Sequence, residues 1–424
     1  MENSKKLADW KQTFFPFWVS QLVSLLGSAL VMFTLVWWLT EKTGSATVLA
    51  TATMAGMIPE IVIQPFAGAI VDRINRKRVI IIADGVIAVA TLVLGVLFYL
   101  DLAEVWAIYG LMLIRAVGGA FHYPAGQASV ALMVPREQLA RLGGLTQAAR
   151  GIINIVSAPL GALILTYMDV EGAMLIDVVS AAIAIAIVAM THIPRQEKLA
   201  SNGGNWFSTV MQDMKDGLRY VMQWKAMVLL VAIALVFKAA LSPAFSLIPL
   251  LVYEYLQGNA AQYSLVEVVG GVGIILGGLL LGVWGGFKQQ VWTIFLGLFG
   301  VGAGIFLMGL LPAGGFIWML PLMFVVGFTV PLVDGPFGAI MQSAVDNAYQ
   351  GRVMTLLGSI LNLSGPIGLA MAGPVSDRFG LQVWYLTAGL LIFACLMFGL
   401  FNKTVMRVEE GPGRRQTAED RETE

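Results

Sequence analysis

The chain has 424 residues, of which 58% are hydrophobic and 12% are charged, and its 26 basic and 26 acidic residues give a net charge of zero. Soluble domains carry about a quarter charged residues, so this composition argues against a soluble protein and favours one that lies in lipid. One cysteine, Cys395, and two histidines exclude an internal disulfide and a cysteine or histidine metal cage, so we expect no metal site.

Apolar segments of about 20 residues follow one another along the chain, and each is long enough to cross a bilayer as a helix. A helix is required there because it satisfies its own backbone hydrogen bonds. The fold class we predict is all-α integral membrane, with twelve transmembrane helices. The expected spans are 15–39, 46–71, 79–99, 104–128, 142–166, 172–191, 226–251, 262–285, 291–311, 316–340, 353–374 and 382–402.

One connection, 192–225, is long and polar, and it divides the chain into six spans and six spans. We expect an N-terminal bundle at 15–191, a cytoplasmic linker at 192–225 and a C-terminal bundle at 226–402. The N-terminus, 1–14, contains acidic side chains and no cleavage site, so we expect a cytoplasmic segment rather than a signal peptide. The polar tail, 403–424, is expected to be disordered.

Basic residues gather in alternate connections. With an even number of spans both termini lie on one side, and nearly all Lys and Arg residues outside the spans lie on that side too. The opposite connections hold only Lys42 and Arg378. Because positive residues stay on the cytoplasmic side, we expect a multi-pass protein of the plasma membrane with both termini in the cytoplasm.

Three landmarks of the first half recur in the second half at an almost constant offset. The pairs are Gly68 with Gly282, Arg141 with Arg352, and Pro159 with Pro366. Duplicated halves of this kind are typical of transporters, with the substrate site near the bilayer midplane between the halves. A further echo, GPVSDRFG at 373–380, repeats the Gly-x3-Asp-Arg spacing of GAIVDR at the end of span eleven.

Three motifs resemble those of the major facilitator superfamily. GAIVDRINRKR, at 68–78, resembles the motif G-x-x-x-D-R-x-G-R-[RK] between spans two and three, with Asn75 in place of the second glycine. Asn also tolerates the left-handed backbone that glycine supplies. LIRAVGGAFHYPA, which contains Arg115, resembles the fourth-span arginine motif. VSAPLGA, around Pro159, resembles a weakened form of the fifth-span antiporter motif, because alanines replace two glycines.

The resemblance covers residues 10–405 and is closest to bacterial macrolide and multidrug efflux proteins in the stretches WVSQLVSLLGSAL, LTEKTGSA, AFHYPA and GRVMTLLGSI. It implies two pseudo-symmetric six-helix bundles and a secondary transporter that works by alternating access. We expect the chain to be a monomer. The expected function is proton-coupled efflux of hydrophobic drugs such as macrolides. The proton gradient is the energy source, no cofactor is expected, and the chain is not expected to be an enzyme.

The resemblance also assigns a cytoplasmic gate to the motif at 68–78, with four residues in it: Gly68, Asp72, Arg73 and Arg76. The aspartate would contact the start of span eleven, at about Gly351 to Met354. A carboxylate beside a helix N-terminus is favoured by the helix dipole. The contact would latch the two halves together on the cytoplasmic side.

Ionisable residues in the middle of a span are costly and are therefore functional candidates. We expect Glu60 and Glu267 first, and then Asp334, to be proton carriers, because a carboxylate can load and release a proton as its solvation and its neighbours change. Arg115 would line the cavity or pair with an acid, as the cation that tunes or replaces the proton. Each has alternatives: Glu267 could instead form a neutralising pair with Lys238. Asp84 could reach the interface, and Asp177 could be a helix cap or a helix–helix hydrogen bond.

Apolar and aromatic residues near these charges suit bulky amphiphilic ligands. The substrate-cavity candidates are Met57, Phe121, His122, Lys238, Phe245 and Phe337. His122 could be pH-sensitive or a hydrogen-bonded packing residue. Two other functions stay open: transport of one specific metabolite such as a siderophore, and a non-transporting membrane receptor. The absence of a G-x-x-x-x-G-K-[ST] loop disfavours an ATP-driven pump, and the short basic clusters do not indicate nucleic-acid binding.

Overall fold

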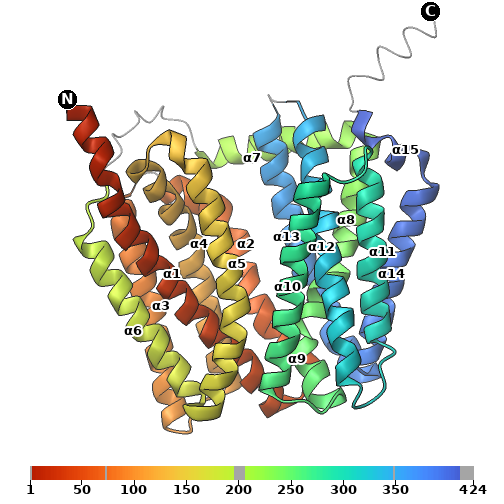
Figure 1. Cartoon of the computed structure of the whole chain (residues 1–424), viewed down its shortest axis with the longest axis horizontal. Helices are drawn as coiled ribbons and strands as arrows, with labels where there is room; N and C mark the ends of the chain where they lie inside the picture. Colours follow the sequence, from red (N-terminus) through yellow and green to blue (C-terminus); the bar gives the residue numbers. More distant parts are fainter. Residues whose placement is uncertain (1, 72–73, 195–205, 347–348, 411–424) are drawn as a thin grey trace, which may run out of the picture. The chain divides into compact units, whose positions relative to one another are not determined.

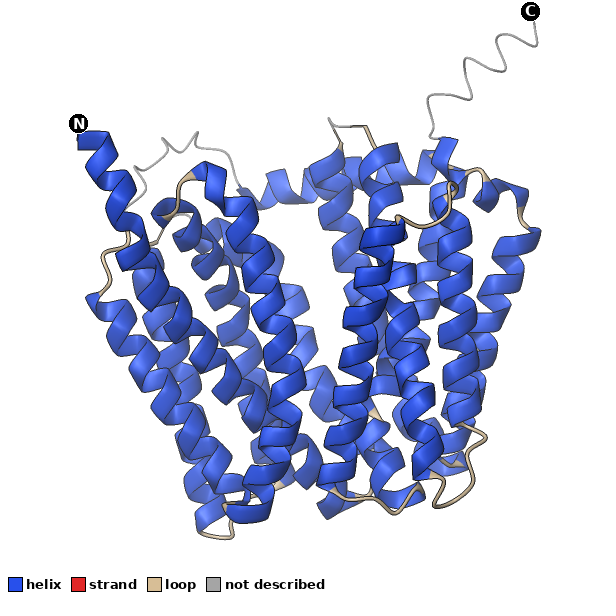
Figure 2. Cartoon of the chain, viewed as in Figure 1, coloured by secondary structure: helices blue, strands red, loops and turns tan. Residues whose placement is uncertain are grey.

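Helices account for the regular structure of the computed structural model, which describes residues 2–71, 74–194, 206–346 and 349–410 (Figures 1 and 2). Twelve helices in these ranges are long and apolar enough to cross a membrane, which confirms the expected number. They are α1 (Glu2–Thr43), α2 (Ala46–Val71), α3 (Arg76–Tyr99), α4 (Val105–Met133), α5 (Arg136–Tyr167), α6 (Asp169–Met190), α8 (Lys225–Ser246), α10 (Ala260–Trp284), α11 (Gln290–Met308), α12 (Phe316–Ala344), α13 (Gln350–Phe379) and α14 (Leu381–Phe401).

Contacts group the chain into two units. The first unit contains residues 1–44, 51–202 and 259–268, and the second contains 45–50, 203–258 and 269–424. Each unit therefore includes the first residues of a helix that belongs otherwise to the other unit, α10 in one case and α2 in the other. Pro159 lies in α5 and Pro366 in α13, the fifth spanning helix of each half, as the repeat requires.

The long connection contains a helix that the sequence reading left as a polar stretch, α7 (Trp206–Gln223). Tyr220, near its end, stacks on Tyr349 with ring centroids 4.9 Å apart. The backbone N–H of Asp346 donates to the Tyr220 hydroxyl at 3.2 Å. Val221 is buried. One face of α7 thus packs on the region where α13 begins, and tertiary packing of this kind supplies most of the stability of helices in proteins.

Helical structure extends before the first expected span and beyond the last one. Helix α1 begins at Glu2, so most of the segment 1–14 continues the first spanning helix. The expected disorder of 403–424 is wrong for its first residues, which form α15 (Lys403–Met406) and a 3-10 turn at Val408–Glu410. Val405 and Val408 are fully buried, and Glu409 Oε1 accepts a hydrogen bond from Val291 N at 3.0 Å. The burial of these two valine side chains explains why this short polar segment is folded against the rest of the chain.

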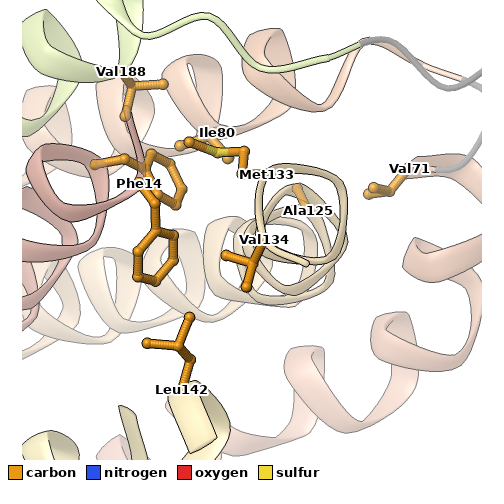
Figure 3. Packing of buried hydrophobic residues seen from close by; sticks show 9 residues of the cluster. Phe14, Val71, Ile80, Ala125, Met133, Val134, Leu142 and Val188 are labelled. Atoms are coloured by element: carbon orange, nitrogen blue, oxygen red, sulfur yellow. The ribbon is translucent and has the colours of Figure 1, made fainter. Parts of the chain in front are cut away.

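A cluster of buried apolar side chains packs together in the first unit (Figure 3). It joins Phe14, Phe17, Val71, Ile80, Ala125, Met133, Val134, Leu142 and Val188, from α1 to α6 and the α4–α5 connection. In lipid, helices associate through close van der Waals packing rather than through escape from water. Phe17 and Leu142 also line the cavity described below, so this cluster closes one side of it.

Candidate functional site: a polar cavity in the first unit

A cavity of about 530 Å³ lies within the first unit, between α1, α3, α4 and α5. Phe17, Trp18 and Tyr123 supply aromatic surface. The polar and charged residues of its lining are Gln21, Ser24, Ser28, Asp84, Arg115, His122, Gln127, Thr146, Gln147 and Arg150. A mixture of aromatic surface with convergent polar groups is typical of a ligand site.

Arg115 lies at the cavity and forms a buried ion pair with Asp177 of α6. Its Nη1 is 2.8 Å from Asp177 Oδ2 and 3.1 Å from Thr91 Oγ1. The hydroxyls of Ser28 and Thr91 donate to the same carboxylate, at 3.0 Å and 3.1 Å. The side chains of Arg115 and Asp177 are 11% and 2% exposed. Of the two readings of Asp177, the helix–helix hydrogen bond is the one that the geometry favours.

The close approach of α1 to α6 makes this network possible. A Cβ atom on Gly27 would overlap Ser180 Oγ and lie 3.0 Å from Asp177 Cα. Glycine is therefore required where the two helices touch, and it brings the next residue, Ser28, within reach of Asp177. Small residues at such crossings let helix backbones approach closely in membranes.

A second group joins three helices at the cavity wall. His122 Nε2 is 2.9 Å from Gln21 Oε1 and 3.2 Å from Asp84 Oδ1. Since both oxygens are acceptors, we assign a proton to Nε2. Asp84 is 7% exposed, so the interpretation that it reaches the interface is wrong. Within the described part of the chain, Asp84 Oδ2 and Gln21 Nε2 are buried without a hydrogen-bond partner.

Two further contacts in the cavity lining join an aromatic side chain to a polar one. The Arg150 guanidinium lies over the ring of Tyr123, 5.3 Å from its centroid, and Trp18 Nε1 donates to Thr146 Oγ1 at 2.9 Å. The sequence reading did not select Trp18 or Gln21. Their signal was present: Trp18, Gln21, Ser24 and Ser28 recur at helical spacing along one face of an otherwise apolar span.

In the second unit, Lys238 of α8 pairs with Asp334 of α12. Lys238 Nζ is 2.9 Å from Asp334 Oδ1 and 3.0 Å from Oδ2. This pair replaces the pairing of Lys238 with Glu267 that the sequence suggested. Glu267 instead lies in the part of α10 that groups with the first unit, where the Tyr263 hydroxyl donates to it. Tyr263 stacks on Phe33 of α1, with centroids 5.0 Å apart.

The sequence profile of the Major Facilitator Superfamily matches residues 17–369. The chain belongs to the Major Facilitator Superfamily. Macrolide efflux protein A of Streptococcus pyogenes is 35% identical over 389 residues, which are 92% of this chain and 95% of that protein. Macrolide efflux protein A of Enterococcus faecalis is 34% identical over 77% of this chain and 100% of its own length. Multidrug efflux pump Tap of Mycolicibacterium fortuitum is 26% identical over 86% of this chain and 89% of its own.

Solved structures share the superfamily fold. The nucleoside transporter NupG superposes with a TM-score of 0.70 at 13% identity, covering 92% of this chain and 99% of that chain. A POT family transporter in complex with a thioalcohol-conjugated peptide superposes with a TM-score of 0.68 at 11% identity, covering 92% and 97%. The expected fold class and the superfamily are confirmed, and this chain is a multi-pass transporter of that superfamily.

The structure describes the gate motif at 68–78 except for residues 72 and 73. Asp72 and Arg73 lie outside the described residues, so their expected contact with α13 stays a prediction. Asn75 has φ −67° and accepts a hydrogen bond from Lys77 N at 3.1 Å. The left-handed interpretation of Asn75 is therefore wrong: it caps α3 in extended backbone, as Asn favours. Gly68 lies in the last turn of α2, where an added Cβ would have nothing within 4 Å, and Arg76 is the first residue of α3.

The other candidate residues are not in the lining of the first-unit cavity. Glu60 and Met57 are half-buried on α2 and are not among the described residues of the cavity lining. Phe121 packs on the apolar cluster and is not in the lining of the first-unit cavity, so its expected part in a substrate cavity stays a prediction. Phe245 of α8 and Phe337 of α12 are half-buried in the second unit, and Phe337 lies one helical turn from Asp334.

Proposed function

We propose that the chain is a proton-coupled exporter of hydrophobic drugs such as macrolides and works by alternating access. The observation that carries this proposal is a full-length relationship to Macrolide efflux protein A combined with the cavity of the first unit. The more distant multidrug pump Tap supports the same direction of transport.

The lining of the cavity suits an amphiphile rather than a small polar metabolite. Phe17, Trp18 and Tyr123 offer flat apolar surface, while amides, hydroxyls and His122 offer donors and acceptors around it. Its volume lies in the usual range for sites of drug-sized ligands, about 300–1,000 Å³. In this proposal the aromatic side chains hold the apolar body of the substrate, and the polar groups hold its hydroxyl, carbonyl or amine groups.

The proton is proposed to be carried by Asp334, Glu60 or Glu267. Arg115 already has a carboxylate partner in Asp177, so its proposed role is to hold the cavity wall rather than to exchange with the proton. Asp334 is the strongest of the three candidates, because its carboxylate is 46% exposed and its partner Lys238 is 36% exposed, so this pair is less enclosed than Arg115 with Asp177. Protonation of Asp334 would release Lys238, which links proton loading to a change in the contact of α8 with α12.

The proposed orientation places both termini in the cytoplasm of the cell, with the chain in the plasma membrane. Contacts within the first unit support it. Lys77 Nζ donates to the carbonyls of Ala189 and Thr191, where α6 ends. Trp10 and Lys11 line a hollow with Arg141, where α5 begins. The basic connections and the N-terminus thus share one end of the unit, the end that positive residues keep cytoplasmic. We further propose a monomer that needs no cofactor beyond the proton gradient.

The test is uptake of a radiolabelled macrolide and of a fluorescent lipophilic cation into everted membrane vesicles, with and without a proton gradient. The variants are Glu60→Gln, Glu267→Gln, Asp334→Asn and Arg115→Ala. Gradient-dependent uptake that one carboxylate variant abolishes supports the proposal and identifies the carrier. Uptake of neither compound overturns the drug substrate, and uptake insensitive to the gradient overturns the proton coupling.

A further inference from the structure

The carboxylate of Asp377, in the last turn of α13, holds the first residues of α2. The backbone N–H of Ala46 donates to Oδ1 at 2.7 Å, and that of Thr47 donates to Oδ2 at 3.1 Å. The Ser45 hydroxyl donates to Oδ2 at 2.9 Å. These are amides that the first turn of a helix cannot satisfy within itself. Asp377 therefore caps a helix that lies more than 300 residues away in the sequence.

The position of Asp377 is unfavourable for its own helix. A negative charge in the last turn opposes the helix dipole, whereas Arg378 beside it is favoured there. The N-terminus of α2 supplies the opposite end of a dipole, so the contact with α2 offsets the unfavourable one. The negative charge of Asp377 is therefore stabilised by the N-terminus of α2 and not by α13, the helix that carries the residue.

Close packing accompanies the hydrogen bonds. A Cβ atom on Gly373, one turn before Asp377, would lie 2.8 Å from Thr47 Cα and 3.3 Å from Ala50 Cβ. Ala46 and Ala50 are each 1% exposed. This packing, together with the hydrogen bonds of Asp377, explains why Ser45–Ala50 group with the second unit. The rest of α2, from Thr51, groups with the first unit.

The residues at the end of α13 that contact α2 have the same spacing as the motif at 68–73. Gly373, Asp377 and Arg378 repeat the spacing of Gly68, Asp72 and Arg73. We propose that Asp377 is a positioning residue for transport: its carboxylate latches the start of α2 to the end of α13, and the latch opens during the transport cycle. The proposal rests on the chain being a transporter, and on neither its substrate nor its coupling ion.

The hydrogen bonds of Asp377 can break at little cost in free energy. Asp377 and its bond to Ser45 are exposed, so water replaces the hydrogen bonds at little cost. A buried carboxylate with the same partners would be left unsatisfied on opening, as Asp177 would be in the first unit.

The test measures how fast a buried position beneath the latch becomes accessible. In a Cys395→Ala background, Ala50→Cys is labelled with a water-soluble maleimide in detergent, so neither substrate nor membrane orientation matters. Asp377→Ala is expected to raise the labelling rate roughly threefold to tenfold, by shifting the population towards the open state. Asp377→Asn keeps a capping oxygen and loses the charge, so its rate is expected to lie between those of the parent and Asp377→Ala.

Two controls separate a latch from general loosening. Glu104→Ala removes an exposed acid that precedes α4 and makes no side-chain cap, and it is expected to leave the rate unchanged. Ala388→Cys reports on the fully buried core of α14 and is expected to stay protected in all variants. An unchanged rate at position 50 in Asp377→Ala overturns the latch. So does an equal rise at position 388. A failed uptake assay does not affect either readout.

Discussion

The Arg115–Asp177 pair and the Lys238–Asp334 pair differ in how far their side chains are exposed. Asp177 has 2% of its side chain exposed and accepts from three side chains, whereas Asp334 has 46% exposed and pairs with Lys238. Removing one member of a buried pair strands the other charge in a poorly solvated site. A pair that its surroundings do not enclose separates at lower cost. The first pair is therefore suited to hold the helices, and the second is suited to change during a transport cycle.

The largest effect on stability is expected when the acid of the buried pair is removed, which tests the difference between the two pairs directly. Asp177→Ala leaves Arg115, Ser28 and Thr91 without their shared acceptor and is expected to destabilise the protein by about 3–5 kcal/mol. The melting temperature of the detergent-solubilised protein measures the effect. Asp334→Ala is the matched control, with an expected loss of less than about 1 kcal/mol. Equal losses in the two variants would contradict the assignment of structural and mobile pairs.

A double replacement separates the structural role of Arg115 from a role in transport. Arg115→Met combined with Asp177→Leu removes both charges and is expected to recover most of the stability that Asp177→Ala loses, because a well-packed apolar pair replaces a buried ion pair at little cost. Uptake by the stable double variant would show that the pair serves the fold alone. Loss of uptake in a protein of parental melting temperature would give Arg115 a direct part in transport.

Gly27 tests whether the helix contact beneath the buried pair is as tight as the geometry indicates. Gly27→Ala is expected to cost about 1–3 kcal/mol, because the added methyl group meets Ser180 and Asp177 and pushes α1 away from α6. The melting temperature again provides the measurement. Gly56→Ala, at a helical glycine with open space around it, is the control and is expected to be neutral or slightly stabilising. A neutral Gly27→Ala would mean that α1 and α6 can move apart freely.

Asp334→Asn tests the exposed pair as a switch. We expect a stability change of less than about 1 kcal/mol, together with loss of gradient-driven uptake in everted vesicles, because the amide cannot load a proton. Lys238→Met, which removes the partner and keeps the acid, is expected to retain part of the gradient dependence. Full gradient-driven uptake by Asp334→Asn would remove this residue from the proton path and leave Glu60 and Glu267 as carriers.

The smallest effect is expected at Glu254, in the π-helical turn at Leu251–Tyr255. Partial burial and then the negative charge of Asp377 raise the pKa of Glu254 above its usual 4.5. A raised folded-state pKa favours the protonated form, so its stabilising contribution is complete below pH 4.5 and is lost as the pH rises through the folded-state value. Glu254→Gln should therefore flatten the pH dependence of the melting temperature slightly in this window. A steeper dependence in the variant would reverse the sign assigned to this contact.

The sequence by itself determined the spans, the duplication and the superfamily. Lipid requires runs of about 20 apolar residues in helical form, and such runs are local features that can be read directly. Residues whose chemistry is unusual for a span, such as Arg115 and His122, were also visible for this reason. The sequence could not determine which helix each of them faces, so it did not predict the contact of Asp84 with His122.

Only the tertiary structure decided the partners. The pairs Arg115 with Asp177, Lys238 with Asp334, and Asp377 with the start of α2 join helices that are distant in the sequence. Helices of similar apolar composition can pack in many orders, and the order is set by small residues such as Gly27 and Gly373 at the crossings. The Gly-x3-Asp-Arg echo at 373–378 was visible as a spacing, but its meaning as a helix cap appears only when α2 and α13 lie together, because a cap is a contact and not a pattern.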